Sequence, residues 1–282
     1  MIFNFDAIKL GRSDFGLSQL GPWSLPELKA IYDAHANVLT KHDWDTVFLS
    51  NHDNPRIVST FGDDSPDMRV QSAKLFETMI LTLRGTPFLF EGDELGMTDY
   101  PFKTLADYDD IAVKNAYKDL VDTGKISAQA FLTSQAKVSR DNARTPMQWD
   151  SSPQAGFTSG SHPWLAVNPN YKQISAAQEE SDPASVLNYV RSLIALRAHA
   201  LAFVYGDYED LDPQHAHVYA YTRTLGSDKY LMVENFSSSR VTYTLPNGLK
   251  AANLLLSDIP GSDEANVSTL NLAPWESRIY KQ

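Results

Sequence analysis

The sequence contains no cysteine, which excludes disulfide bonds and zinc sites built on thiolates. It also has no apolar run that approaches the roughly 20 residues of a membrane-spanning helix. Lysine and arginine total 24 against 35 aspartate and glutamate, so the formal net charge is −11. Because nucleic-acid binders need a basic footprint, this charge disfavours nucleic acid as a partner and gives no attraction to an anionic membrane.

Met1–Asp6 carries no basic residue ahead of its apolar residues and no cleavage site, so it does not have the pattern of a secretory signal peptide. Together with the lack of cysteine, this favours a cytoplasmic location. The chain has 282 residues, of which 43% are hydrophobic and 21% are charged. These values are typical of a soluble globular protein with one large domain or two ordinary ones.

Strands and helices alternate in the first part of the chain. Ser24 stands three residues before Glu27, the spacing of a capping box, and apolar residues follow at helical period as far as Leu39. A second helix is expected to end at Gly85. Strands are expected before, between and after these helices, at residues 2–5, 46–49 and 87–90. This order predicts parallel βαβ units.

The periodicity is lost between about residues 98 and 182, apart from a short helix expected at 111–122. A stretch of this length is too long for a plain connection and predicts a functional insertion. Asp182 and Pro183 are expected to begin the next helix, as N-cap and first position. Beyond Ala200, short strands separated by turn residues predict a small antiparallel β domain, with strands at 218–222, 229–233, 241–245, 254–256 and 277–280. We therefore expect the chain to divide into two parts: residues 1–200, which contain the alternating strands and helices with the insertion, and residues 201–282, which form the β domain.

The clearest candidate site is the hexapeptide Asn-His-Asp-Asn-Pro-Arg at residues 51–56, which follows an expected parallel strand. In α/β barrels the carboxyl ends of the strands build the active site. A carboxylate such as Asp53 beside an imidazole such as His52 can hold two adjacent sugar hydroxyls, and Arg56 can orient that carboxylate or keep it ionised. The alternative is a surface loop with an Asx turn before Pro55. The hexapeptide alone leaves both interpretations open.

Three longer motifs carry a resemblance to a known family. Residues 48–53, Phe-Leu-Ser-Asn-His-Asp, look like the seventh-strand motif of glycoside hydrolase family 13, the α-amylase superfamily. Residues 86–97 resemble its eighth strand and the loop that follows. Residues 140–149, Arg-Asp-Asn-Ala-Arg-Thr-Pro-Met-Gln-Trp, are similar to a segment typical of its oligo-1,6-glucosidase and α-glucosidase branch. The motifs occur in the family's order and extend over nearly the whole chain.

The resemblance implies an α/β fold: a partial (β/α)8 TIM barrel, strands six to eight, followed by the antiparallel β domain. It implies a retaining α-glucosidase that hydrolyses terminal α-linked glucose from short oligosaccharides of the maltose or isomaltose type. Asp53 corresponds to the family's third carboxylate, which binds sugar hydroxyls and stabilises the transition state. His52, Arg56, Arg140 and Arg144 correspond to substrate-binding residues. No metal or other cofactor is implied.

The family's nucleophile and general acid lie on strands four and five, and neither motif occurs here. The resemblance therefore implies a chain that is inactive alone, whose partners are an α-glucosidic oligosaccharide and a missing N-terminal half. The chain can then be a truncated product or one piece of a split enzyme. The alternatives are a non-catalytic carbohydrate-binding or scaffold relative, and a fragment of a sucrose isomerase or transglycosylase. For the isomerase, residues 9–13 share one leucine and one arginine with the Arg-Leu-Asp-Arg-Asp motif of those enzymes.

Two acidic groups are weaker candidates for a function. Glu91, Asp93 and Glu94 follow an expected strand, where a cation site is conceivable, but their spacing is not that of an EF-hand and favours a hydrated loop. Asp107, Asp109 and Asp110 are expected to form a solvated run of charge.

Overall fold

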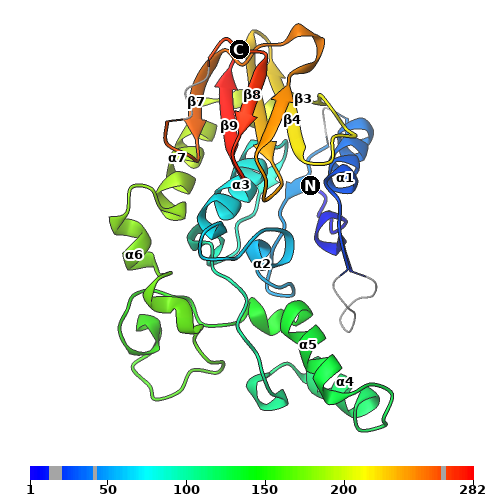
Figure 1. Cartoon of the computed structure of the whole chain (residues 1–282), viewed down its shortest axis with the longest axis vertical. Helices are drawn as coiled ribbons and strands as arrows, with labels where there is room; N and C mark the ends of the chain where they lie inside the picture. Colours follow the sequence, from blue (N-terminus) through cyan, green and yellow to red (C-terminus); the bar gives the residue numbers. More distant parts are fainter. Residues whose placement is uncertain (13–20, 41–42, 262–264) are drawn as a thin grey trace.

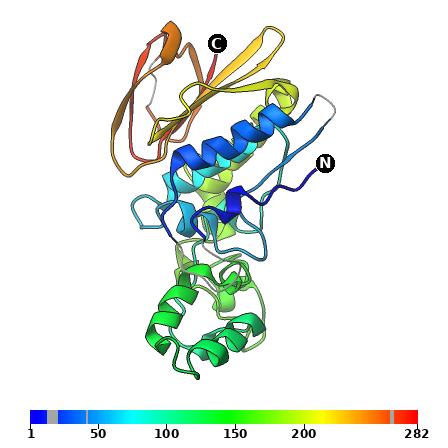
Figure 2. The ribbon, with the colours of Figure 1, turned by 90° about the vertical axis from the view of Figure 1, so that its right-hand side faces the viewer.

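The structure, a computed structural model, describes residues 1–12, 21–40, 43–261 and 265–282. It is elongated and has three tiers (Figures 1 and 2): β-strands at one end, a layer of helices in the middle, and a lobe of helices and loops at the other end. The middle layer contains α1 (Leu25–Val38), α3 (Arg69–Thr82) and α7 (Val186–His199), and the far lobe contains α4 (Ile111–Leu120) and α5 (Ala128–Val138). The shorter helices are α2 (Ile57–Phe61), α6 (Ala176–Ser181) and α8 (Leu201–Tyr205).

Two short strands, β1 (Thr46–Val47) and β2 (Thr86–Pro87), pair in parallel, as the βαβ pattern predicts. Both are shorter than expected. The strand expected at residues 2–5 is wrong: Ile2 makes a single parallel bridge to Asp45, and the chain then turns. The turn is local, because the side-chain oxygen of Asn4 accepts the backbone N–H of Asp6 at 2.7 Å. The assignment of these strands to positions six to eight of a barrel remains a prediction.

The three long helices occur where they were expected, but two of their ends differ from the prediction. Helix α3 ends at Thr82, with Leu83 already extended, rather than at Gly85. Ser24 starts α1 as expected, with its N–H donating to Glu27 Oε2 at 2.9 Å. The start of α7 is later than expected, because Ser185 is its cap and accepts the N–H of Asn188 at 3.1 Å. Asp182 instead ends α6. The predicted insertion at about residues 98–182 also contains α5 and α6, which were not predicted from the sequence.

The predicted antiparallel sheet is present, with strand order β3-β4-β5-β9-β7 and a separate pair β6-β8. Its strands are β3 (Asp207–Asp210), β4 (Val218–Leu225), β5 (Asp228–Asn235), β6 (Val241–Thr244), β7 (Asn253–Ser257), β8 (Thr269–Leu272) and β9 (Ser277–Lys281). All five predicted strands occur, whereas β3 and β8 were missed.

Both faces of the central strands are covered. Tyr219 and Tyr221 of β4 enter the core shared with the helical layer, while Val218 and Ala220 enter a second core against β6 and β8. Because neither face meets water, β4 lacks the polar alternation of a surface strand. The buried Arg223 is accommodated by donating to the backbone oxygens of Thr82 and Gly206. The sheet is thus packed against the layer that positions the site.

One buried carboxyl in α3 has no partner. Glu77 is 1% exposed, and neither of its carboxyl oxygens has a hydrogen bond. Burial raises its pKa well above 4.5, and repulsion by Asp93 and Glu94 adds to this effect. A carboxyl with a raised pKa in the folded state binds its proton more tightly there than in the unfolded chain. Its contribution to stability is therefore greatest below pH 4.5 and is lost as the pH rises toward the folded value.

We expect Glu77→Met to stabilise the protein. A methionine of similar size removes the unpartnered polar atoms, whose burial typically costs about 1–3 kcal/mol. Differential scanning calorimetry should show a higher Tm, with a larger gain at pH 8 than at pH 5. The exposed Glu209 provides the control, since Glu209→Met should leave the Tm nearly unchanged. A lower Tm for Glu77→Met at pH 8 would contradict this account.

Candidate active site

The loop after β1 presents His52 and Asp53 at the carboxyl end of the strand. The side-chain oxygen of Asn51 accepts the N–H of Asp53 at 2.8 Å and the amide of Asn54 at 2.6 Å. This is the Asx turn that the alternative interpretation predicted. The turn uses Asn51, however, and leaves the side chains of His52 and Asp53 outside its hydrogen bonds. The loop is therefore both a turn and a means of presenting these two groups.

Asp53 lies beside two guanidinium groups and an imidazole. Its Oδ1 is 2.8 Å from Arg144 Nη2 and 3.3 Å from Arg140 Nη1, and its Oδ2 is 3.3 Å from His52 Nε2. The Asp53 side chain is 46% exposed, and each arginine side chain is about a third exposed. The structure thus brings together four of the five residues that the sequence analysis selected. The charges of Asp53, Arg140 and Arg144 meet at a surface that a ligand can reach.

Arg140 is fixed by Asp110, which the sequence analysis did not select. Arg140 Nη2 donates to Asp110 Oδ1 at 2.8 Å, and the same oxygen caps α4 by accepting the N–H of Ala112 at 2.9 Å. Burial alone would raise the pKa of Asp110, but the hydrogen bonds from Arg140 and Ala112 outweigh burial and hold that pKa below its usual value. The prediction of a solvated charge is wrong for Asp110, which is buried. Its position just before an expected helix was the signal of an N-cap.

Arg144 is held through its backbone and its side chain. Its Nε donates to the backbone oxygen of His52 at 2.9 Å, and its own backbone oxygen accepts Nε1–H of Trp164 at 2.8 Å. Trp164 is 63% exposed and packs edge-on against Phe157, with ring centroids 5.0 Å apart. The loop that contains the tryptophan therefore positions the arginine beside Asp53.

Arg56 does not orient Asp53, which corrects the interpretation drawn from the sequence. Its guanidinium is buried and donates to the backbone oxygens of Glu91 at 2.5 Å and Ala143 at 3.2 Å. Burial lowers the pKa of Arg56, although nearby carboxylates oppose this effect. Its backbone N–H donates to Asp99, whose pKa burial raises to about 8. Arg56 thus connects the loop after β1 to the loops that carry Glu91 and Ala143.

The prediction of a hydrated acidic loop after β2 is wrong for Asp93, whereas Glu91 is exposed and Glu94 is partly exposed. Asp93 is buried, contacts Ser50 Oγ and accepts the N–H of Phe90 at 3.0 Å. Burial raises its pKa to about 6, although the hydrogen bond from Ser50 and the charge of Arg56 act against that rise. Among the residues that the structure describes, no group of three or more His, Asp or Glu side chains is placed to hold a metal.

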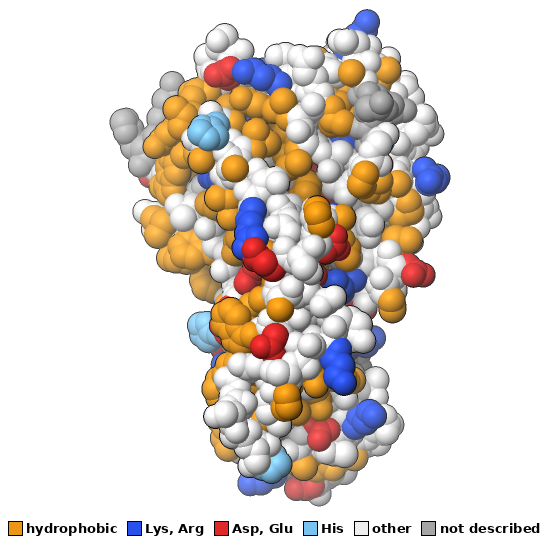
Figure 3. All heavy atoms as spheres, turned by 90° about the vertical axis from the view of Figure 1, so that its left-hand side faces the viewer, with side chains coloured by type: hydrophobic (Ala, Val, Ile, Leu, Met, Phe, Trp, Pro, Cys, Tyr) orange, Lys and Arg blue, Asp and Glu red, His pale blue; other side chains and the backbone are white. Residues whose placement is uncertain are grey.

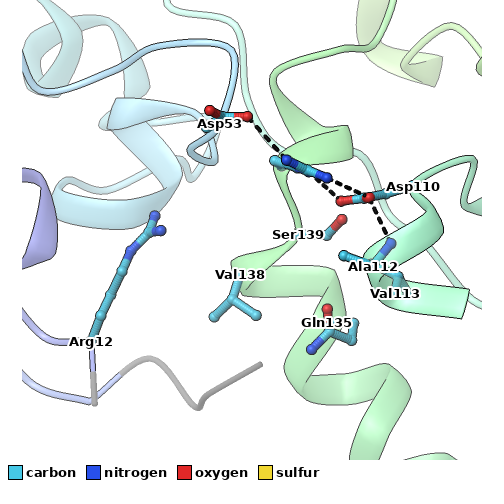
Figure 4. A pocket seen from close by; sticks show the side chains of 9 residues that line it. Arg12, Asp53, Asp110, Ala112, Val113, Gln135, Val138 and Ser139 are labelled. Carbon is cyan, nitrogen blue, oxygen red and sulfur yellow. Dashed lines mark hydrogen bonds and ion pairs between the residues drawn. The ribbon is translucent and has the colours of Figure 1, made fainter. Parts of the chain in front are cut away.

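A pocket of about 220 Å³ adjoins Asp53 (Figure 4). Asp53, Arg140 and Arg12 line it, and the rest of its wall is formed by residues of α4 and α5 with Asp110 and Ser139, which directly precede α4 and follow α5. Arg12 belongs to the segment at residues 9–13 that was compared with the isomerase motif. Ser13 of that segment lies outside the described residues. No helix in the described part of the chain has the length and hydropathy needed to cross a membrane.

Comparison with known proteins gives matches along nearly the whole chain. Residues 1–206 match the family described as "Alpha amylase, catalytic domain", and residues 218–279 match "Alpha-amylase SusG C-terminal domain". An oligo-1,6-glucosidase of Parageobacillus thermoglucosidasius is 39% identical over 100% of this chain and 50% of its own length. An α-glucosidase of Pediococcus pentosaceus is also 39% identical, over 100% of this chain and 50% of its own length.

Solved structures give the same picture. A mutant trehalulose synthase in complex with Tris matches with a TM-score of 0.94 and 48% identity, over 99% of this chain and 50% of that one. A mutant isomaltulose synthase from Erwinia rhapontici NX5, in complex with its natural substrate sucrose, matches with a TM-score of 0.94 and 47% identity, over 99% of this chain and 50% of that one. The chain thus spans about half the length of the relatives it matches. The matching catalytic-domain family and the similarity to oligo-1,6-glucosidases show that this chain belongs to the α-amylase family, glycoside hydrolase family 13.

Proposed function

We propose that this chain provides the glucosyl-binding wall of a retaining α-glucosidase that acts on short oligosaccharides of the maltose or isomaltose type. The observation that carries the proposal is the half-exposed carboxylate of Asp53, at the carboxyl end of β1, beside His52 and two guanidinium groups. A carboxylate accepts hydrogen bonds from two adjacent sugar hydroxyls, and the imidazole adds a further polar contact. The named activities of the curated relatives support this substrate class.

The proposed role of Asp53 follows from the charge of the transition state. Retaining glycosidases cleave through an oxocarbenium-like transition state and use a nucleophile and an acid about 5–5.5 Å apart. On the family resemblance, those two carboxyls belong to the half of the relatives that this chain does not match. Asp53 is then a third carboxylate, which binds the sugar ring and stabilises the positive charge developing on it. Arg140 and Arg144 hold Oδ1, while Oδ2 faces His52.

Saturation-transfer NMR with methyl α-glucoside tests the proposal on the 282-residue chain itself. We expect the wild-type chain to bind the glucoside and Asp53→Asn to bind it at least about threefold more weakly, because a hydrogen bond to a charged group is among the stronger ones. Asp119→Asn, at an exposed position on α4, removes the same charge away from the site and should leave binding unchanged. No binding by the wild-type chain would refute the proposal.

A second candidate is a sucrose isomerase. Its support is the identity to the solved trehalulose and isomaltulose synthases, 47% to 49%, against 34% to 41% for the curated oligo-1,6-glucosidases. Arg12, from the segment that partly matches the isomerase motif, also lines the pocket beside Asp53. An assay with sucrose distinguishes the two functions. The chain is first combined with the other half of a relative, and the products are then identified. An isomerase converts sucrose to isomaltulose or trehalulose, whereas a glucosidase releases free glucose and fructose.

We expect Arg144→Ala to affect substrate binding more than stability. The variant loses one contact to Asp53 and the contact to the His52 backbone, so the affinity for isomaltose should fall about threefold to tenfold. The Tm should change little, because ion pairs at this exposure contribute only about 0–1 kcal/mol. Arg191→Ala is the matched control, since Arg191 forms an exposed ion pair with Glu180 away from the site. If the Tm falls and the affinity does not, Arg144 is structural.

A further inference from the structure

The pocket beside Asp53 contains a polar group that the site described so far does not use. Gln135 of α5 is 1% exposed and lines the pocket, where Figure 4 shows its side chain. Neither its amide nitrogen nor its amide oxygen has a hydrogen-bond partner. A buried amide without partners destabilises the folded chain, so an arrangement that keeps one requires an explanation.

Neighbouring polar groups in the wall already have partners. Asp110 accepts from Arg140 and from the N–H of Ala112, and Ser139 Oγ accepts the N–H of Asp141 at 3.2 Å. None of these groups forms a hydrogen bond with the amide of Gln135. The pocket is also small and partly apolar, because Val113 and Val138 line it together with Gln135. Such a wall suits a ligand that presents hydroxyl groups together with C–H faces.

We infer that Gln135 is a specificity-determining residue, whose amide binds a hydroxyl of the second sugar unit, the one joined to the glucosyl unit at Asp53. The inference rests on the proposed function, because it needs the glucosyl unit at Asp53, which lines the same pocket. An amide offers a donor and an acceptor, and a sugar hydroxyl is both as well. The second sugar would satisfy the amide, while its C–H faces contact Val113 and Val138.

The affinities for a monosaccharide and a disaccharide test the inference. Isomaltose should bind the wild-type chain more tightly than methyl α-glucoside does, as measured by saturation-transfer NMR titration. Gln135→Met keeps the size of the side chain and removes its amide. The variant should bind isomaltose about threefold to tenfold more weakly than the wild-type chain does, and its affinity for methyl α-glucoside should be unchanged. Gln129→Met, at an exposed position on the same helix, is the matched control and should change neither affinity.

The Tm of the ligand-free variant separates a ligand-binding role from a structural one. If the amide has no partner in the ligand-free chain, Gln135→Met should raise the Tm. If the amide supports the fold, Gln135→Met should lower the Tm. If the methionine variant does not fold, Gln135→Asn can replace it. This variant shortens the side chain by one methylene, and its affinities for isomaltose and methyl α-glucoside are compared in the same way.

The outcomes distinguish the inference from the function on which it rests. A wild-type chain that binds neither sugar overturns the proposed function and the inference with it. A wild-type chain that binds methyl α-glucoside, with a Gln135→Met variant that binds isomaltose as tightly as before, overturns the inference alone. If Gln135→Met loses affinity equally for both sugars, or has a lower Tm, Gln135 supports the fold and does not bind the second sugar.

Discussion

Asp53→Asn is expected to reduce isomaltose hydrolysis at least about a hundredfold in an active complex of this chain with the other half of a relative. This factor is typical when one group that stabilises transition-state charge is removed. Asparagine keeps the size of the side chain but loses the negative charge that the proposed function places against the sugar ring. The Tm should change little, because the Asp53 side chain is 46% exposed and its ion pairs are partly hydrated.

Steady-state kinetics on isomaltose, with calorimetry of the same preparations, would measure both effects. Asp119→Asn is the control for the loss of one carboxylate and should have normal turnover. The catalytic assignment of Asp53 fails if the asparagine variant turns over at a near-normal rate. It fails equally if the variant is inactive because it no longer folds.

The second large effect concerns the chain on its own, which we predict to self-associate and to hydrolyse no α-glucoside. Phe3, Phe5 and Phe88 are 50%, 41% and 38% exposed, and they form an aromatic cluster with the buried Phe48. Parallel sheets normally have both faces covered, so this exposure beside the short β1–β2 pair is unusual. Exposed apolar clusters and unpaired strand edges both favour association.

Hydrophobic side chains are also exposed on another face of the molecule. Figure 3 shows the side that carries α6, α7 and β7, where hydrophobic side chains gather in the upper part of the view and scattered charged side chains lie among and below them. We expect association to depend on the aromatic cluster, because its large apolar rings are exposed and contact one another. Sedimentation should detect species larger than the 31.4 kDa chain, and Phe3→Ser with Phe88→Ser should shift them toward the monomer.

A chromogenic α-glucoside tests the activity of the same sample. No release of the chromophore is expected from the chain alone, and adding the other half of a relative as a separate polypeptide should restore some activity. A monomer that hydrolyses the glucoside would contradict both parts of this prediction. A chain that binds oligosaccharide, but gains no activity with any such half, would support the binding or scaffold relative instead.

The sequence located several local features correctly, because their determinants lie within a few residues. The capping box at Ser24 and Glu27 sets the start of α1, and short apolar segments between turn residues marked β4, β5, β6, β7 and β9. It failed at Asp182, where two competing caps lie three residues apart and Ser185 begins the helix. It also failed at residues 2–5, where one Asx turn ends an apolar segment.

By itself, the sequence determined the family, the loop that presents His52 and Asp53, and the candidate arginines. Only the tertiary structure decided which arginines meet the carboxylate. Arg56, three residues from Asp53, donates to backbone oxygens instead, whereas Arg140 and Arg144 reach Asp53 from 87 and 91 residues away. The physical reason is that sequence spacing fixes geometry only within one element, while contacts between distant loops depend on how the elements pack. For the same reason, nothing in the periodicity of α5 marked Gln135, because the burial of its side chain and the lack of partners for its amide are properties of the folded chain.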